Sequence, residues 1–174
     1  MEKVIQVLNQ MQADGIIEGF AIGGGIAAIR YLDYYLTDDI DVFISPVVVG
    51  PNGLVSFGRI YSYLEELGYN TEREYIRIEG WLVQFVPASE SVQEEAVAQA
   101  DRVAFAGEYT SIFSSEHLAA ELLRSGRLKD HTRVVALLES GQMDMEVFHD
   151  IVSRHGLAEQ WKEFAVRYDW RSDE

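Results

Sequence analysis

The chain has 174 residues, a formal net charge of −15 and no cysteine. Hydrophobic residues make up 48% of it and aromatic residues 11%, which are values of a globular protein with a sizeable core and exclude a disordered chain. The lack of cysteine excludes disulfides, thiolate metal sites and cysteine nucleophiles. It fits a reducing compartment, so we expect a cytoplasmic protein, and the sequence predicts no signal peptide and no membrane span.

The acidic balance also bears on the partners. Nucleic-acid binding needs lysine and arginine to displace counterions from phosphates, so this composition disfavours DNA or RNA as a partner unless a local basic strip exists. The same charge favours solubility and the attraction of divalent cations.

The first part of the chain alternates between helical and strand patterns. Apolar residues at helical spacing predict a helix over residues 2–13, which ends at Asp14-Gly15. The pattern then predicts, in order, a strand at 16–22, a helix at 26–35, a strand at 39–45, a loop at 46–53 and a helix at 54–67. A β-hairpin with strands at 70–78 and 81–87, a helix at 91–100 and a strand region at 103–112 follow.

From Ser114 onward the pattern is helical only. We expect helices at 115–124, 128–140, 144–154 and 157–169. The change of pattern predicts two parts, an α/β core over 1–113 and a helical subdomain over 114–174. The expected fold class is therefore α+β, with a small mixed β-sheet and flanking helices followed by a C-terminal helical subdomain.

Two carboxylates open the strand at 39–45. Asp39 and Asp41 are separated by one apolar residue, and alternation along a strand sends both to the same face. Like charges at that distance repel each other, and a divalent cation between them relieves the conflict. Carboxylate oxygens suit Mg²⁺ or Mn²⁺, so these two residues are candidate metal ligands.

A run of three glycines lies upstream of these acids. Gly24 and Gly25 belong to it, directly after an apolar strand and directly before a helical pattern. Glycine allows the backbone to approach a ligand closely, and the start of a helix favours phosphate. One end of the sheet is thus predicted to combine phosphate donors with a metal site, which is what nucleoside-triphosphate chemistry requires.

The segments at residues 20–27 (FAIGGGIA) and 36–44 (LTDDIDVFI) resemble the core signature of the polymerase-β-like nucleotidyltransferase superfamily. More narrowly, they are similar to the small proteins related to AbiEii-type toxin nucleotidyltransferases. The resemblance implies that Asp39 and Asp41 are the catalytic metal carboxylates and that Gly24 and Gly25 bind the nucleotide. Residues 126–130 resemble a Lys-Asp pair on a helix of these relatives, which implies that Lys129 faces the nucleotide.

The function implied is the transfer of a nucleoside monophosphate from a nucleoside triphosphate (NTP) to an acceptor, with Mg²⁺ or Mn²⁺. The acceptor is expected to be a small molecule or a protein sooner than a nucleic acid, and no membrane is involved. A partner protein or a homodimer is compatible with the resemblance.

One position departs from the superfamily pattern. Its members carry a third carboxylate on a later strand. The matching residue here is Gln84, whose neutral amide cannot act as a general base. Three alternatives follow. In the first, Asp39 and Asp41 hold one metal well enough for catalysis. In the second, another acid replaces the third carboxylate, with Glu79 and Glu90 as candidates. In the third, transfer is lost. The alternative function is therefore a catalytically impaired nucleotide-binding or toxin–antitoxin interaction module with the same fold, and Gln84 is a candidate site-lining residue.

Overall fold

A seven-stranded mixed sheet organises the structure, a computed structural model that describes residues 1–33, 37–45, 48–49, 54–55 and 57–170. The strands, in chain order, are β1 (Phe20–Ile22), β2 (Asp39–Ile44), β3 (Val48–Val49), β4 (Leu54–Val55), β5 (Asn70–Glu72), β6 (Tyr75–Ile78), β7 (Trp81–Pro87), β8 (Asp101–Phe105) and β9 (Glu108–Ile112). The large sheet has the order β5-β6-β7-β2-β1-β9-β8, and β3 pairs with β4 in a separate two-stranded ladder.

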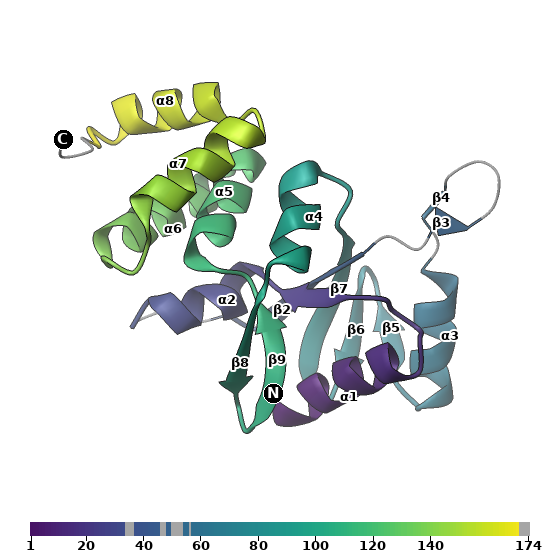
Figure 1. The fold of residues 1–174 in the computed structure, drawn as a ribbon. Coiled ribbons are helices and arrows are strands. Elements are labelled where there is room, and N and C mark those ends of the chain that lie inside the picture. Colours follow the sequence, from purple (N-terminus) through teal and green to yellow (C-terminus); the bar gives the residue numbers. More distant parts are fainter. Residues whose placement is uncertain (34–36, 46–47, 50–53, 56, 171–174) are drawn as a thin grey trace.

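The first helices alternate with the strands along the chain, and the last helices follow the final strand. They are α1 (Glu2–Ala13), α2 (Gly24–Tyr31), α3 (Gly58–Glu66), α4 (Ser91–Ala98), α5 (Ser115–Ser125), α6 (Leu128–Glu139), α7 (Met145–Arg154) and α8 (Ala158–Arg167). Figure 1 shows α5 to α8 gathered to one side of the sheet, with β3 and β4 extending from the opposite side. The α+β prediction is confirmed.

Strand β2 occupies the middle of the sheet and determines the position of the acidic pair. It runs antiparallel to β1 and parallel to β7. Ile40 and Val42 are fully buried, as expected for a central strand that is covered on both faces. Asp39 and Asp41 alternate with them and are only partly buried, so they lie at the end of β2 where the sheet meets solvent.

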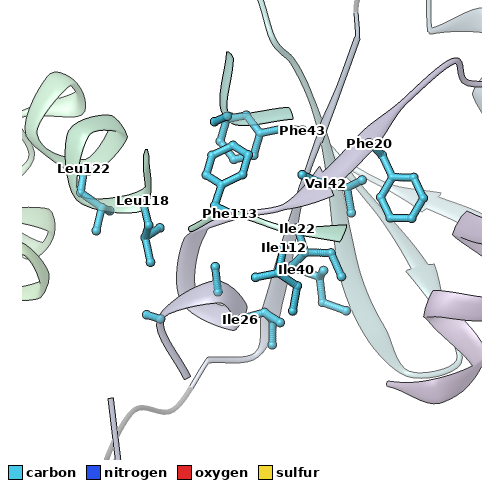
Figure 2. Packing of buried hydrophobic residues seen from close by; sticks show 14 of the residues in the cluster. Phe20, Ile22, Ile26, Ile40, Val42, Phe43, Ile112, Phe113, Leu118 and Leu122 are labelled. Carbon is cyan, nitrogen blue, oxygen red and sulfur yellow. The ribbon is translucent and has the colours of Figure 1, made fainter. Parts of the chain in front are cut away.

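The hydrophobic core is continuous from the sheet into the helical part. The rings of Phe43, on β2, and Phe113, just after β9, have centroids 4.7 Å apart. Leu118 and Leu122 of α5 belong to the same buried cluster and approach these rings from the helical side (Figure 2). The side chains on either side of Ser114 therefore share one core.

The four predicted C-terminal helices are present, and their ends have identifiable causes. Ser114 caps α5 by accepting a hydrogen bond from the backbone N–H of His117 at 3.2 Å. Gly126 ends α5 in the left-handed conformation, with φ +64°. Asp144 caps α7 by accepting from the N–H groups of Glu146 and Val147. No helix in the described ranges is long and apolar enough to span a bilayer.

Several predicted boundaries were wrong. The strand predicted at 16–22 is limited to β1, because the backbone of Ile16 and Ile17 turns back to bond Met11 at the end of α1. The helix predicted at 54–67 begins only at Gly58, because Leu54–Val55 pair with Val48–Val49. Most of the loop predicted at 46–53, and the end of the helix predicted at 26–35, lie outside the described residues.

Two predicted strands are in fact hairpins. The segment 70–78 divides into β5 and β6 at Arg73, which has a positive φ of 60°. The region 103–112 divides into β8 and β9 at Ala106 and Gly107, with φ 50° and 89°. The hairpin between β6 and β7, with its turn at Glu79-Gly80, matches the prediction.

Candidate functional site

The glycine turn after β1 lies directly against the acidic strand. The Gly23 N–H donates to the backbone carbonyl of Asp41 at 2.9 Å. A Cβ built on Gly24 would lie 1.9 Å from Oδ2 of Asp41, and the φ of Gly24 is +54°. Both the space and the backbone conformation therefore exclude a side chain at this residue. The sequence prediction that these two motifs approach each other is met by the geometry.

Gly25, the next glycine, lies beside Thr37, which in turn contacts Asp39. A Cβ on Gly25 would lie 2.7 Å from Oγ1 of Thr37. The Thr37 hydroxyl donates to the side-chain carboxylate of Asp39 and lies 3.3 Å from its backbone carbonyl oxygen. Thr37 thus holds Asp39 at the start of β2, a role that was not predicted from the sequence.

Gln84 is paired with Asp41 in the register of the sheet. The parallel ladder between β2 and β7 places these two residues opposite each other, and Asp39 opposite Leu82. Paired residues of adjacent strands present their side chains to the same face. Gln84 therefore presents its side chain on the same face of the sheet as Asp41. Neither Glu79, in the β6–β7 turn, nor Glu90, before α4, lines the cleft that surrounds this pair.

Asp41 and Gln84 line a cleft of about 430 Å³ between the sheet and the helical part. Its floor includes Gly24, Asp41 and Gln84. Helices α4, α5 and α6 and the connection between α5 and α6 contribute the other wall. It includes three arginine side chains, Arg124 on α5, Arg127 just before α6 and Arg133 on α6. Gly25, Asp39 and Lys129 do not line it.

The electrostatic setting of Asp41 follows from this enclosure. Burial, and then the neighbouring charge of Asp39, raise the pKa of the Asp41 carboxyl above its usual value. The positive charges of Arg127, Arg133 and Lys129 act in the opposite direction and lower that pKa. The net shift is upward, because burial and Asp39 together outweigh the three cationic residues.

The predicted cation, Lys129, is exposed and lies outside the cleft. The arginines that do line it were missed. Arg127 and Arg133 both bond the fully buried carboxylate of Asp130, which lies three residues from each on α6. The spacing Arg-x-x-Asp-x-x-Arg is visible in the sequence and was the available signal, since residues three apart are neighbours on a helix.

A second buried carboxylate organises the remaining arginine. Glu121 accepts from Arg124 in a two-point contact, with Nε to Oε2 at 2.8 Å and a terminal nitrogen to Oε1 at 3.0 Å. Glu121 also accepts from the side-chain amide of Gln93 on α4 at 2.9 Å. Arg124 is thereby held between the cleft and a larger cavity of about 670 Å³, which α5, α6 and α8 enclose and which contains none of the predicted site residues.

The donor set fits a hard divalent cation in part. Asp39 and Asp41 offer carboxylate oxygens, and Gln84 offers an amide oxygen. No group of three or more His, Asp or Glu suited to a metal occurs within the described ranges. The protein thus supplies two carboxylates, and phosphate or water oxygens would have to complete the coordination of Mg²⁺.

Comparison with known proteins identifies the fold. No protein-family model and no curated protein matches the sequence. Solved structures do match. The solution structure of the antibiotic-resistance factor ANT(2'')-Ia is 17% identical with a TM-score of 0.54, covering 95% of this chain and 94% of its own. A crystal structure of ANT(2'')-Ia in complex with adenylyl-2''-tobramycin is 18% identical with a TM-score of 0.52, covering 95% and 97%.

A nucleotidyltransferase-like antigenic protein from Paracoccidioides brasiliensis is also similar, at 16% identity and a TM-score of 0.53, with 91% of this chain and 90% of that chain covered. At such identities the likeness shows the fold. The chain has a nucleotidyltransferase-like fold over nearly its whole length. The narrower resemblance to AbiEii-type proteins stays a prediction.

Proposed function

We propose that the protein transfers a nucleoside monophosphate from an NTP to an acceptor hydroxyl, with Mg²⁺ or Mn²⁺, in the cleft between the sheet and helices α4 to α6. The observation that carries the proposal is the contact of Gly24 with Asp41. A glycine turn without side chains lies against the Asp41 carboxylate, and arginine side chains line the same cleft. That combination suits a metal-bound polyphosphate.

Each predicted residue has a place in this scheme. Asp39 and Asp41 would hold the cation, which when bound supplies charge neutralisation for the phosphates. Gly24 and Gly25 begin α2, and in the described part of the chain no side chain caps its first turn. The N–H groups of that turn suit phosphate oxygens. Lys129 would contribute from the rim of the cleft, because its charge acts on Asp41 from outside the lining.

The reaction would join the acceptor oxygen to the α-phosphorus and release pyrophosphate as the bond to the bridging oxygen breaks, and the hydroxyl proton would be lost to water. A small-molecule acceptor is the preferred class. ANT(2'')-Ia, which shares the fold over nearly the whole chain, has been solved with an adenylylated small molecule, adenylyl-2''-tobramycin. The identity of the acceptor for this chain does not follow from that likeness.

The alternative function is nucleotide binding without transfer, as in a catalytically impaired or toxin–antitoxin interaction module. Gln84 favours it. The residue paired with Asp41 cannot take a proton from an acceptor hydroxyl, and neither Glu79 nor Glu90 replaces it in the cleft. The toxin–antitoxin form of this alternative further requires a partner protein.

The test has two parts. The protein is incubated with each of the four labelled NTPs and Mg²⁺, and pyrophosphate release is measured with candidate hydroxyl acceptors, aminoglycosides among them. Calorimetry with Mg²⁺ and the same NTPs measures binding. Transfer requires both signals, and the alternative requires binding alone. The double variant Asp39→Asn, Asp41→Asn should lose metal-dependent NTP binding and keep the fold, and unchanged binding in that variant would refute the assignment of the site.

A further inference from the structure

The positive charges of this acidic protein are unevenly distributed. It has 14 Lys and Arg residues against 29 Asp and Glu, yet four of the 14 fall within residues 124–133. Three of these four, all arginines, line the cleft that contains Asp41. The cluster lies where α5 ends and α6 begins, opposite the glycine turn.

A buried carboxylate fixes two of these arginines. Asp130 is completely buried, and its Oδ2 accepts from Nε of Arg127 at 2.6 Å and from the Ser125 hydroxyl. Its Oδ1 accepts from a terminal nitrogen of Arg133 at 3.2 Å. A buried carboxylate is stable only when paired and hydrogen-bonded, so this arrangement ties the positions of both guanidinium groups to Asp130.

Arg127 and Arg133 differ in how much of the side chain is exposed. Arg133 is largely buried, with 14% of its side chain exposed, whereas 60% of the Arg127 side chain is exposed. Arg127 uses Nε for Asp130, and within the described residues its terminal nitrogens make no hydrogen bond. These nitrogens keep a planar pair of donors, which is the group that binds phosphate oxygens at two points.

Both arginines lie in the same cleft as the acidic strand. They share its lining with Gly24 and Asp41. The glycine turn and the arginine pair thus bound the same space from opposite sides.

We propose that Asp130 is a positioning residue, which holds Arg127 and Arg133 as a cation pair for the terminal phosphates of a nucleotide bound at Asp41. The proposal rests on the function proposed above and deepens it. It assigns recognition of the phosphate chain to the two arginines that the buried Asp130 aligns, and not to Lys129 alone. It also predicts that affinity depends on the number of phosphates.

The experiment compares ligands that differ only in phosphate number. Calorimetry first finds which of ATP, GTP, CTP and UTP binds best with Mg²⁺, and then measures the tri-, di- and monophosphate of that base on the wild-type protein and its variants. Inorganic pyrophosphate serves as a probe without a base. Asp130→Asn, Arg127→Met and Arg133→Met should each reduce triphosphate affinity about tenfold or more and leave monophosphate affinity within about threefold, since each removes charge-assisted bonds to the outer phosphates.

The ratio of triphosphate to monophosphate affinity separates positioning from a structural role. A variant that only loosened the fold would lower its melting temperature and weaken all three nucleotides together. Arg154→Met is the matched control, because it deletes an arginine with two ion pairs that does not line the cleft, and it should leave the ratio unchanged. Arg127→Met keeps the test decisive if Asp130→Asn fails to fold, because Arg127 lies at the exposed start of α6.

The outcomes are distinguishable. A fall in the ratio for all three variants, with Arg154→Met unchanged, supports the proposal. If the wild-type protein binds Mg-NTP through Asp39 and Asp41 but the ratio is unaffected in Arg127→Met and Arg133→Met, the arginine pair is not the phosphate site and the proposal is overturned. If the wild-type protein binds no Mg-NTP at all, the proposed function itself fails.

Discussion

At the scale of single residues, the site depends on a position where no side chain fits. The turn at Gly24 approaches Asp41 so closely that a methyl group would lie 1.9 Å from its carboxylate oxygen. The same residue has a positive φ, so two separate costs attend any substitution. These two costs can be measured apart, because the chain has other glycines with positive φ in open space.

Gly24→Ala should destabilise the protein by about 2–4 kcal/mol and displace Asp41, because strain and clash add. Gly141→Ala is the matched control. Gly141 has φ +66° with nothing within 4 Å of a built Cβ, so it should lose only the strain, about 1 kcal/mol. Urea unfolding of both variants gives the difference. Equal losses would show that the contact with Asp41 is unimportant for stability.

The residue paired with Asp41 offers a second test at this scale. Gln84→Glu restores a carboxylate on β7 beside Asp41. It should raise Mn²⁺ affinity about tenfold or more, because a third oxyanion joins the site, and should weaken stability without metal because like charges meet. Titration calorimetry with Mn²⁺ and melting with and without Mn²⁺ measure both. No gain in Mn²⁺ affinity would mean that β7 faces away from the metal.

At the scale of elements, one carboxylate joins three helices. Glu95 of α4 accepts hydrogen bonds from His117 of α5 at 3.2 Å, from His155 at the end of α7 at 3.0 Å, and from Arg154 of α7. The bond from Arg154 and those from the histidines hold the pKa of Glu95 down at about 2. Burial lowers the pKa of His117, which thus stays neutral at lower pH than a free histidine.

Glu95→Gln should therefore lower the unfolding free energy by about 1–3 kcal/mol at neutral pH. A carboxyl whose pKa is lower in the folded state stabilises above its unfolded value of 4.5 and loses that contribution as pH falls toward 2. The difference between wild type and variant should shrink over that interval. Asp150→Asn, which removes an exposed partner of Arg154, is the control and should cost no more than about 0.5 kcal/mol. A difference independent of pH would contradict this reading.

The elements also show what could be predicted from the sequence. Long helices with a clear apolar stripe, such as α1 and α5 to α8, were predicted within a few residues of their ends. The hairpin at 70–78 was missed because Arg73, a non-glycine residue, adopts positive φ at its turn, which the sequence does not signal. The turn in the region 103–112 contains Gly107, so a signal was present there and was overlooked.

The candidate site likewise has one part that could be predicted from the sequence and one part that could not. The proximity of Gly24 and Asp41 follows from the consecutive strands β1 and β2, so local pattern was sufficient to predict it. Gln84 lies on β7, which pairs with β2 across a long stretch of chain, and its position was expected only from the family resemblance. The positions of Arg127 and Arg133 depend on how α5 and α6 fold back over the sheet. Long-range packing determines that return, and it is not encoded in any short stretch of the sequence.

At the scale of the whole molecule, the sheet and the helical part have a common interior. Phe43 and Phe113 pack with Leu118 and Leu122, so the buried cluster crosses the predicted boundary near Ser114 (Figure 2). The cleft too takes its walls from both parts. A boundary in the sequence pattern is therefore a boundary in secondary structure but not in the core.

A fragment of residues 1–113 should not fold stably, because removal of α5 uncovers apolar side chains that the full chain buries. Its circular dichroism should keep partial secondary structure without a cooperative thermal transition, and it should bind the dye ANS. The full chain, handled identically, provides the reference. A sharp melting transition in the fragment would show that the core over 1–113 is autonomous.

Arg124 lines both the cleft and the cavity beside α8, and Glu121 fixes its guanidinium group by a two-point contact. A side chain changes position by rotation about a few single bonds, whereas a wall of backbone does not. The shape of both hollows at this shared residue therefore depends on the rotamer of one arginine.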